Sequence, residues 1–180
     1  DWGPRLPFCA MALTRFDDLI KEVFTVKGSG TYFAYHMIDY FPSPSEDILA
    51  KCVTTIEASF GRSLCSDYLN QSIKGVISQR DYQGCVVFLE LDSDLIYIDK
   101  FAVRPLFRGT GLGKRLWLDL INQATNLIWR AAPDNPMNAF YQSQATFQVQ
   151  QDNWIIYGIG DSDIIRKWIP KIALKASSFI

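Results

Sequence analysis

The sequence predicts an α/β (α+β) domain built on a mixed, mostly antiparallel sheet that is flanked by helices. Strand-like runs follow one another at residues 76–80, 85–91 and 95–103, and turns typical of hairpins separate them. Helical patterns lie before and after these runs. The element order is helix, helix, strands, helix, strand, helix, strand, which suits such a domain.

Composition narrows the possible functions. The chain has 180 residues, of which 48% are hydrophobic and 21% charged, and this is enough for one domain with a proper core and at most an appendage. Its net charge of −1 gives no electrostatic reason for binding nucleic acid or an anionic membrane. No apolar run is long enough for a membrane span, and no signal peptide is evident.

The cysteines and the single histidine argue against a zinc site or a serine hydrolase. His36 is the only histidine, and a structural role for it is more probable than a catalytic one. The four scattered cysteines are interpreted as reduced, mostly buried thiols, although a disulfide is not ruled out. They are Cys9, Cys52, Cys65 and Cys85. No metal is expected.

Residues 1–44 are interpreted as an extension and linker, and residues 45–180 as the main domain. The extension contains a short helical pattern at residues 13–22 and a Gly-Ser-Gly turn at residues 28–30. Pro42 and Pro44 mark the boundary. Ser45 then caps a predicted helix that ends at Gly61.

The remaining elements follow in order. A second helix is predicted from Ser66 to Gly75, before the three strands. Pro105 ends the last of these strands, and a helix follows at residues 111–124. The final predicted elements are a strand at 127–131, a helix at 138–144, a strand at 153–159 and a helix at 164–174 that Pro170 interrupts.

The most informative motif joins the third strand to the helix after it. It reads Arg-Gly-Thr-Gly-Leu-Gly-Lys from Arg108 to Lys114. A glycine-rich turn at a helix N-terminus directs unpaired backbone N–H groups toward one point, which favours a phosphate. The spacing fits neither a Walker loop nor a dinucleotide-binding fingerprint. It resembles the pyrophosphate loop of the GNAT N-acetyltransferases, which hold acetyl-CoA, although it is also compatible with a plain helix start.

Several further segments together resemble one narrower family. They are Ala58–Arg62, Tyr97–Val103, Trp129–Arg130 and Asn135–Tyr141. They are similar to the C-terminal acetyltransferase domain of vertebrate-like N-acetylglutamate synthases, including bacterial bifunctional synthase/kinases. The resemblance covers about residues 45–160. Residues 22–31 resemble the end of an amino-acid kinase domain, which suggests a fragment of a larger chain.

The resemblance implies a GNAT fold and transfer of an acetyl group from acetyl-CoA to L-glutamate, for arginine biosynthesis. It also implies a homo-oligomer with a kinase domain in the full-length chain. The expected compartment is the bacterial cytoplasm, or the mitochondrial matrix in a eukaryote.

Specific residues inherit roles from this resemblance. Tyr141 would protonate the leaving thiolate, and Lys100 would act beside it in the catalytic site. Glutamate would be bound by Arg62, Lys100, Arg130 and Asn135. Coenzyme A would be bound by Ala102, Val103, Arg108, Gly109, Thr110, Gly111, Leu112, Gly113 and Lys114.

One position departs from the family pattern. The family reads W-R-S-R where this chain has Ala132 in place of the second arginine. An arginine introduced there is expected to strengthen glutamate binding, unless another cation such as Arg104 or Lys74 already occupies that place. The missing charge keeps open a weakly active domain that serves assembly or regulation. A non-enzymatic interaction module also remains an alternative.

The residues also have plainer interpretations. For Lys100 the alternative is an ordinary strand-end lysine, and for Arg130 it is an ion pair with Asp99 or Asp134. For Arg62 the alternative is a solvated cation after a helix. For Asn135 it is a turn residue, and for Tyr141 a core aromatic.

Overall fold

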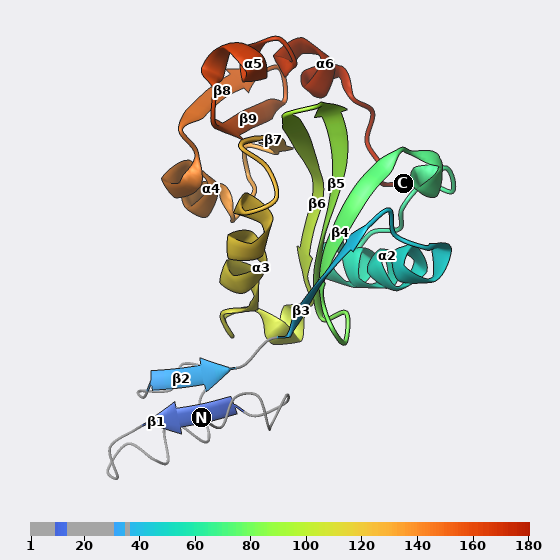
Figure 1. Cartoon of the computed structure of the whole chain (residues 1–180), viewed down its shortest axis with the longest axis vertical. Coiled ribbons are helices and arrows are strands. Elements are labelled where there is room, and N and C mark those ends of the chain that lie inside the picture. Colours follow the sequence, from blue (N-terminus) through green and yellow to red (C-terminus); the bar gives the residue numbers. More distant parts are fainter. Residues whose placement is uncertain (1–9, 14–30, 35–36) are drawn as a thin grey trace.

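The computed structural model describes residues 10–13, 31–34 and 37–180. Its main body is a seven-stranded sheet with strand order β3-β4-β5-β6-β7-β9-β8. Every neighbouring pair is antiparallel except β6 and β7, which are parallel. The predicted fold class, a mixed and mostly antiparallel sheet with flanking helices, is therefore confirmed (Figure 1).

The strands of this sheet are β3 (Ile38–Pro42), β4 (Ile73–Gln79), β5 (Gly84–Asp92), β6 (Leu95–Val103), β7 (Asn126–Ala131), β8 (Phe147–Gln151) and β9 (Trp154–Ile159). The helices packed on it are α2 (Glu46–Phe60), α3 (Leu112–Ile121), α4 (Asn138–Gln144), α5 (Ser162–Arg166) and α6 (Ile169–Leu174). Two short 3₁₀ turns are η3 (Tyr68–Asn70) and η4 (Pro105–Phe107).

Two strands near the N-terminus form a separate antiparallel pair, β1 (Ala10–Leu13) with β2 (Thr31–Ala34). The helix predicted at residues 13–22 lies outside the described residues, except for Leu13, which ends β1. The Gly-Ser-Gly turn, His36 and Cys9 also lie outside them. The division at residues 44 and 45 remains a prediction.

Local sequence signals correctly predicted the first large helix. Ser45 is the N-cap of α2, and its hydroxyl accepts a hydrogen bond from the Ile48 amide at 3.5 Å. Gly61 follows the helix with φ of 64°, a left-handed conformation that glycine adopts without strain. Pro105 does follow the end of β6.

Other predicted elements were wrong. The helix predicted from Ser66 to Gly75 is only the turn η3, after which β4 begins at Ile73. Gly75 lies within that strand, where the Phe88 ring occupies the space a side chain would need. The glycine therefore allows close strand packing and does not end a helix. The strands β3 and β8 were not predicted.

The predicted C-terminal helix at 164–174 is two helices. The break comes at Lys167 and Trp168, before Pro170, which lies in the first turn of α6. Proline is tolerated there because the first amides of a helix have no intrahelical acceptor.

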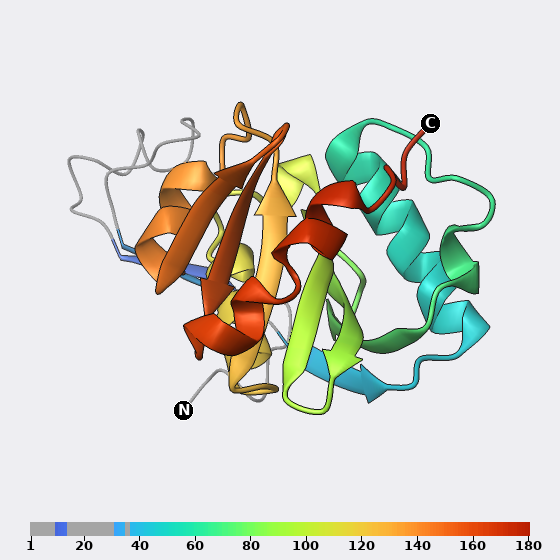
Figure 2. The same ribbon diagram turned by 90° about the horizontal axis from the view of Figure 1, so that it is seen from above.

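The two faces of the sheet carry different cores. α3 and α4 cover one face, where their side chains pack with alternate residues of β6 and β7, including Ile98 and Trp129. α2 covers the other face with α5 and α6, where Tyr97 and Ile128 are buried (Figures 1 and 2). β6 and β7 therefore contribute buried side chains to the cores on both faces, which are called the α3/α4 face and the α2/α6 face below.

Candidate functional site

The glycine loop is exposed and begins α3 without a side-chain cap. Gly109 and Gly111 have φ of 79° and 87°, and a Cβ at either would meet no atom within 4 Å. In the described part of the chain, the N-cap of α3, Gly111, makes no side-chain cap hydrogen bond. The first turn of α3 therefore presents N–H groups and the positive end of the helix dipole to a ligand.

The side chain of Arg108 fixes the loop in place. Its guanidinium donates to the Ser59 carbonyl at 2.7 Å and to the Val103 carbonyl at 3.3 Å. The loop is thereby tied to the end of α2 and the end of β6. The guanidinium of Arg108 is therefore used to hold the loop in position.

The sheet opens beside this loop. β6 pairs with β7 only from Leu95 to Ile98, and the last pair is Ile98 with Trp129. The rest of β6 pairs only with β5, up to Val103 opposite Gly84. Among the described residues, the β7-facing edge of Asp99–Val103 therefore has no strand partner, and it lies in a position where it can pair with an extended ligand.

Tyr141 lies on the α3/α4 face in a group of rings. This aromatic cluster consists of Trp117, Trp129, Tyr141 and Tyr157, and each of the other three rings has its centre 5.7 to 6.3 Å from that of Tyr141. Burial raises the pKa of Tyr141 to about 12. The phenol therefore stays protonated at neutral pH and can serve as a proton donor.

A bulge in β6 places two opposite charges on the α2/α6 face. Val87 pairs with Lys100 and Phe88 with Ile98, so Asp99 is an extra residue in β6. Lys100 Nζ lies 2.7 Å from Asp99 Oδ2, and the side chains are 8% and 2% exposed. Without the bulge, these successive residues would point to opposite faces. Lys100 is therefore a buried mid-strand lysine, unlike the strand-end lysine considered from the sequence.

The C-terminal segment, residues 172–180, packs against Asp99 and Lys100 on this face. Lys100 Nζ also donates to the Asp99 carbonyl at 3.3 Å and to Ser178 Oγ at 3.2 Å. The Phe179 ring centre lies 5.3 Å from both Lys100 Nζ and Arg62 Cζ. The Ser178 carbonyl accepts from the Cys65 amide at 2.9 Å, which holds the segment against the loop after α2.

Arg130 is bound to the same segment. Its guanidinium donates to the carbonyls of Ile172, Ala173 and Ala176 at 2.8, 3.2 and 3.1 Å. It also lies 4.0 Å from the centre of the Trp154 ring. Arg130 thus caps the carbonyl end of α6, and it does not make the ion pair with Asp99 or Asp134 that the sequence left open.

Asn135 forms a turn before α4. Its Oδ1 accepts from the Met137 amide at 2.9 Å, and its own amide donates to the Ala132 carbonyl at 3.0 Å. Nearby, Asn138 Nδ2 holds the carbonyls of Ala132 and Pro133, each at 2.9 Å. The side-chain oxygen of Asn135 is therefore used within the turn, as the turn interpretation expects.

The structure brings the predicted residues together in two groups. Lys100, Arg130 and Arg62 gather under the C-terminal segment, and Tyr141 lies on the opposite face with the aromatic cluster. Lys175 and Ser178 were missed because Ser178 is 78 positions from Lys100 along the chain, a distance over which the sequence carries no local signal.

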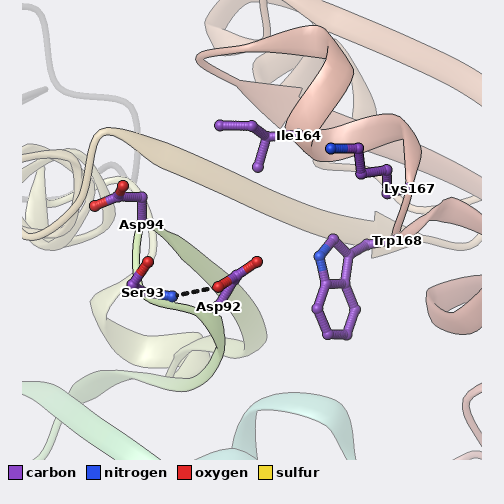
Figure 3. Close-up of a pocket in the computed structure, with 6 residues that line it drawn as sticks. All are labelled: Asp92, Ser93, Asp94, Ile164, Lys167 and Trp168. Atoms are coloured by element: carbon purple, nitrogen blue, oxygen red, sulfur yellow. Dashed lines mark hydrogen bonds between the residues drawn. The ribbon is translucent and has the colours of Figure 1, made fainter.

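A small cavity of about 100 Å³ lies elsewhere. It is lined by Asp92, Ser93 and Asp94 from the β5–β6 turn and by Ile164, Lys167 and Trp168 (Figure 3). This is the end of β6 opposite the glycine loop, so the cavity does not belong to the candidate site.

The described part of the chain shows no sign of a metal site or a membrane span. Its His, Cys, Asp and Glu residues form no group of three that suits a metal ion. None of its helices is long and apolar enough to cross a membrane. Cys52 and Cys85 are buried thiols, and Cys65 is a partly buried one.

Comparisons with known proteins agree with this geometry. A family model described as "NAT, N-acetyltransferase, of N-acetylglutamate synthase" matches residues 41–175. An acetylglutamate kinase from Xanthomonas campestris is 34% identical over 87% of this chain and 38% of its own length. The mitochondrial N-acetylglutamate synthase of Mus musculus is 30% identical over 89% of this chain and 32% of its own length. The chain thus spans under two fifths of these relatives.

Solved structures support the fold. The structure of a "putative acetyltransferase from GNAT family" of Bacteroides thetaiotaomicron matches with a TM-score of 0.56 at 15% identity. The match covers 75% of this chain and 93% of that one. At this identity the similarity establishes the GNAT fold alone.

Proposed function

The chain belongs to the N-acetyltransferase family of N-acetylglutamate synthase, and we propose that it transfers the acetyl group of acetyl-CoA to the amine of L-glutamate. The product, N-acetyl-L-glutamate, serves arginine biosynthesis in this proposal. The observation that carries it is the opening between β6 and β7, with a protonated phenol on one face and the buried cation of Lys100 on the other.

Acetyl-CoA would bind from the α3/α4 side. Its pyrophosphate would accept from the amides of the loop Gly109–Lys114, and its pantetheine arm would lie along the open edge at Ala102 and Val103. The uncapped start of α3 and the exposed loop support this placement.

The reaction would need no covalent enzyme intermediate. The neutral amine nitrogen of glutamate attacks the thioester carbonyl carbon, the C–S bond breaks, and the amine loses a proton to solvent. Tyr141 donates its phenolic proton to the leaving thiolate and is reprotonated afterwards. The elevated pKa of Tyr141 supports this role because the phenol is protonated when the thiolate leaves.

The acceptor would bind from the α2/α6 side. Glutamate with a neutral amine is a dianion. Lys100 supplies a buried positive charge there and Arg130 a partly buried one, with Arg62 at the edge. Burial, followed by the nearby charges of Lys175 and Arg130, lowers the pKa of Lys100, although Asp99 opposes this. An anion bound beside Lys100 would favour the charged ammonium and raise its pKa again. Asn135 would contribute its amide NH₂.

The alternatives differ in what they predict. The alanine at position 132, in place of the second family arginine, favours a weakly active domain that serves assembly or regulation. Such a domain would bind coenzyme A but acetylate glutamate slowly. An interaction module would not bind coenzyme A. The names of the bacterial relatives favour an amino-acid kinase domain in the full-length chain, with residues 1–44 as the connection to residues 45–180. Self-association and a bacterial cytoplasmic location complete the proposal.

The test is a thiol-release assay with acetyl-CoA and a panel of amino acids. We expect turnover with glutamate at least about tenfold above that with glutamine, because the second carboxylate gains a charge-assisted hydrogen bond of about 1.5–3 kcal/mol. Equal turnover of the two amino acids would contradict a dicarboxylate site. Absence of both turnover and coenzyme A binding would favour the interaction module.

A further inference from the structure

A second cation shares the buried carboxylate of Asp99 on the α2/α6 face. Lys175, in the C-terminal segment, has its Nζ 3.3 Å from Asp99 Oδ1, while Lys100 binds the other oxygen, Oδ2. Asp99, Lys100, Arg130 and Lys175 will be called the charged cluster. It contains three cations and one carboxylate.

This excess of positive charge matches a dianion. Three cations and one carboxylate give the cluster a net charge of +2, with the almost fully buried pair of Asp99 and Lys100 at its centre and Lys175 partly exposed beside it. Partly desolvated cations gain most from charge-assisted hydrogen bonds, so the cluster favours a ligand that carries two negative charges. A free dicarboxylate is such a ligand.

Lys175 is better placed than Lys100 to touch that ligand. Lys100 already donates to three acceptors, which uses all three N–H groups of an ammonium. Lys175 contacts two acceptors among the described residues, Asp99 and Gln71 Oε1 at 2.7 Å. The Lys175 side chain is also 23% exposed, against 8% for Lys100. It therefore lies at the solvent side of the cluster.

The place of Lys175 also explains the missing arginine. Arg130 donates to the carbonyl of Ala176, so the residue next to Lys175 lies directly beside the guanidinium. Ala132 follows Arg130 by two positions and comes directly after the end of β7 at Ala131. Lys74 was one of the two cations suggested from the sequence for this place. It pairs with Glu90 at 2.9 Å on the surface and is therefore engaged elsewhere.

We propose that Lys175 is an acceptor-binding residue, which contacts a carboxylate of the acceptor and supplies the cation that Ala132 does not. The inference rests on the proposed function in taking the acceptor to be a dicarboxylate. It assigns to the C-terminal segment a binding role in addition to its packing role.

The experiment uses glutarate, a dicarboxylate without an amine, so that binding is measured without turnover. Glutarate is titrated by calorimetry into the chain saturated with coenzyme A. Lys175→Met keeps most of the apolar stem and removes the charge, and we expect glutarate affinity to fall about tenfold or more. Coenzyme A affinity should not change. Lys171→Met is the matched control, since that ammonium lies over the Trp168 ring, 4.6 Å from its centre.

A rescue variant and a labelling experiment distinguish the loss of a ligand contact from misfolding of the Lys175→Met variant. Adding Ala132→Arg to Lys175→Met should restore glutarate binding, whereas Ala132→Arg alone should change it little because Lys175 is present. On the unaltered protein, glutarate should protect the Lys175 amine from acetylation by an N-hydroxysuccinimide ester, read by mass spectrometry, and leave Lys171 unprotected.

Each outcome is decisive. Unchanged glutarate affinity in Lys175→Met, no protection of Lys175, or no binding of glutarate to the parent protein would overturn the inference. A parent that binds glutarate through Lys175 but does not acetylate glutamate would support the inference and refute the proposed function.

Discussion

The two faces of the sheet at β6 and β7 differ in chemistry: the α3/α4 face is aromatic and uncharged, and the α2/α6 face is charged. On the α3/α4 face, Trp129 and its neighbours surround the neutral Tyr141 phenol. On the α2/α6 face, the next residue of the same strand, Arg130, joins three other charged side chains. Strand alternation separates the two environments, and the bulge at Asp99 concentrates charge on one of them. Two neighbouring strands can therefore border an aromatic environment on one face of the sheet and a charged environment on the other.

The largest effect should come from removing the proton donor on the neutral face. Tyr141→Phe should slow acetyl transfer by about 10²–10⁴-fold, a typical contribution of proton transfer. Coenzyme A affinity should hardly change because the ring still packs. Single-turnover kinetics test this, with Tyr157→Phe as the control from the same aromatic cluster. A full rate in Tyr141→Phe would show that Tyr141 is only a core residue.

The pH dependence of the same step sharpens this test. Because the pKa of Tyr141 is raised to about 12, the donor stays protonated through pH 10. We therefore expect no loss of rate from Tyr141 between pH 7 and pH 10. A fall in the rate of the parent that is absent in Tyr141→Phe would contradict the raised pKa.

The next largest effect should come from the charged face. Asp99→Asn leaves the buried Lys100 without its carboxylate and should lower the free energy of unfolding by about 3–5 kcal/mol, which urea denaturation measures. A loss below about 0.5 kcal/mol would show that the pair contributes little.

The stability difference between Asp99→Asn and the parent should itself depend on pH. Burial alone would raise the pKa of Asp99, but the charges of Lys100 and Lys175 lower it below its ordinary value. A depressed folded-state pKa gives stability that is present above the unfolded value of about 4 and is lost as the pH falls through the folded value. The gap between the two proteins should therefore narrow below about pH 4. A gap that widens there would reverse the assigned direction.

The smallest effect should come from the glycine loop, and it should be confined to the cofactor. Gly111→Val forces a β-branched residue to φ of 87°, which costs about 1–3 kcal/mol of stability. It also fills the space that a pyrophosphate would need. Gly61→Val is the matched control, since Gly61 has φ of 64° and also has open space around it. Only Gly111→Val should weaken coenzyme A binding in an equilibrium titration, and equal binding by both would reassign the phosphate site.

Local signals in the sequence were enough for the elements whose ends depend on near neighbours. Ser45 and Gly61 delimit α2 because capping involves residues within one turn. The strand, glycine loop and helix at 95–121 were predicted for the same reason. The helix predicted from Ser66 failed because Gly75 is required by the distant Phe88 ring, which no local pattern reports.

The tertiary structure decided how the candidate site is assembled. The sequence identified Lys100 and Arg130 as cations through a family resemblance, but their hydrogen-bond acceptors lie in residues 172–178. The bulge that turns Asp99 toward Lys100 depends on the register between β5 and β6, which is set by long-range pairing. The sequence by itself determined the fold class, the glycine loop and the missing arginine at Ala132. Only the folded chain brings Lys175 to Asp99, because burial and ion pairing act between residues that are close in space, whatever their separation along the chain.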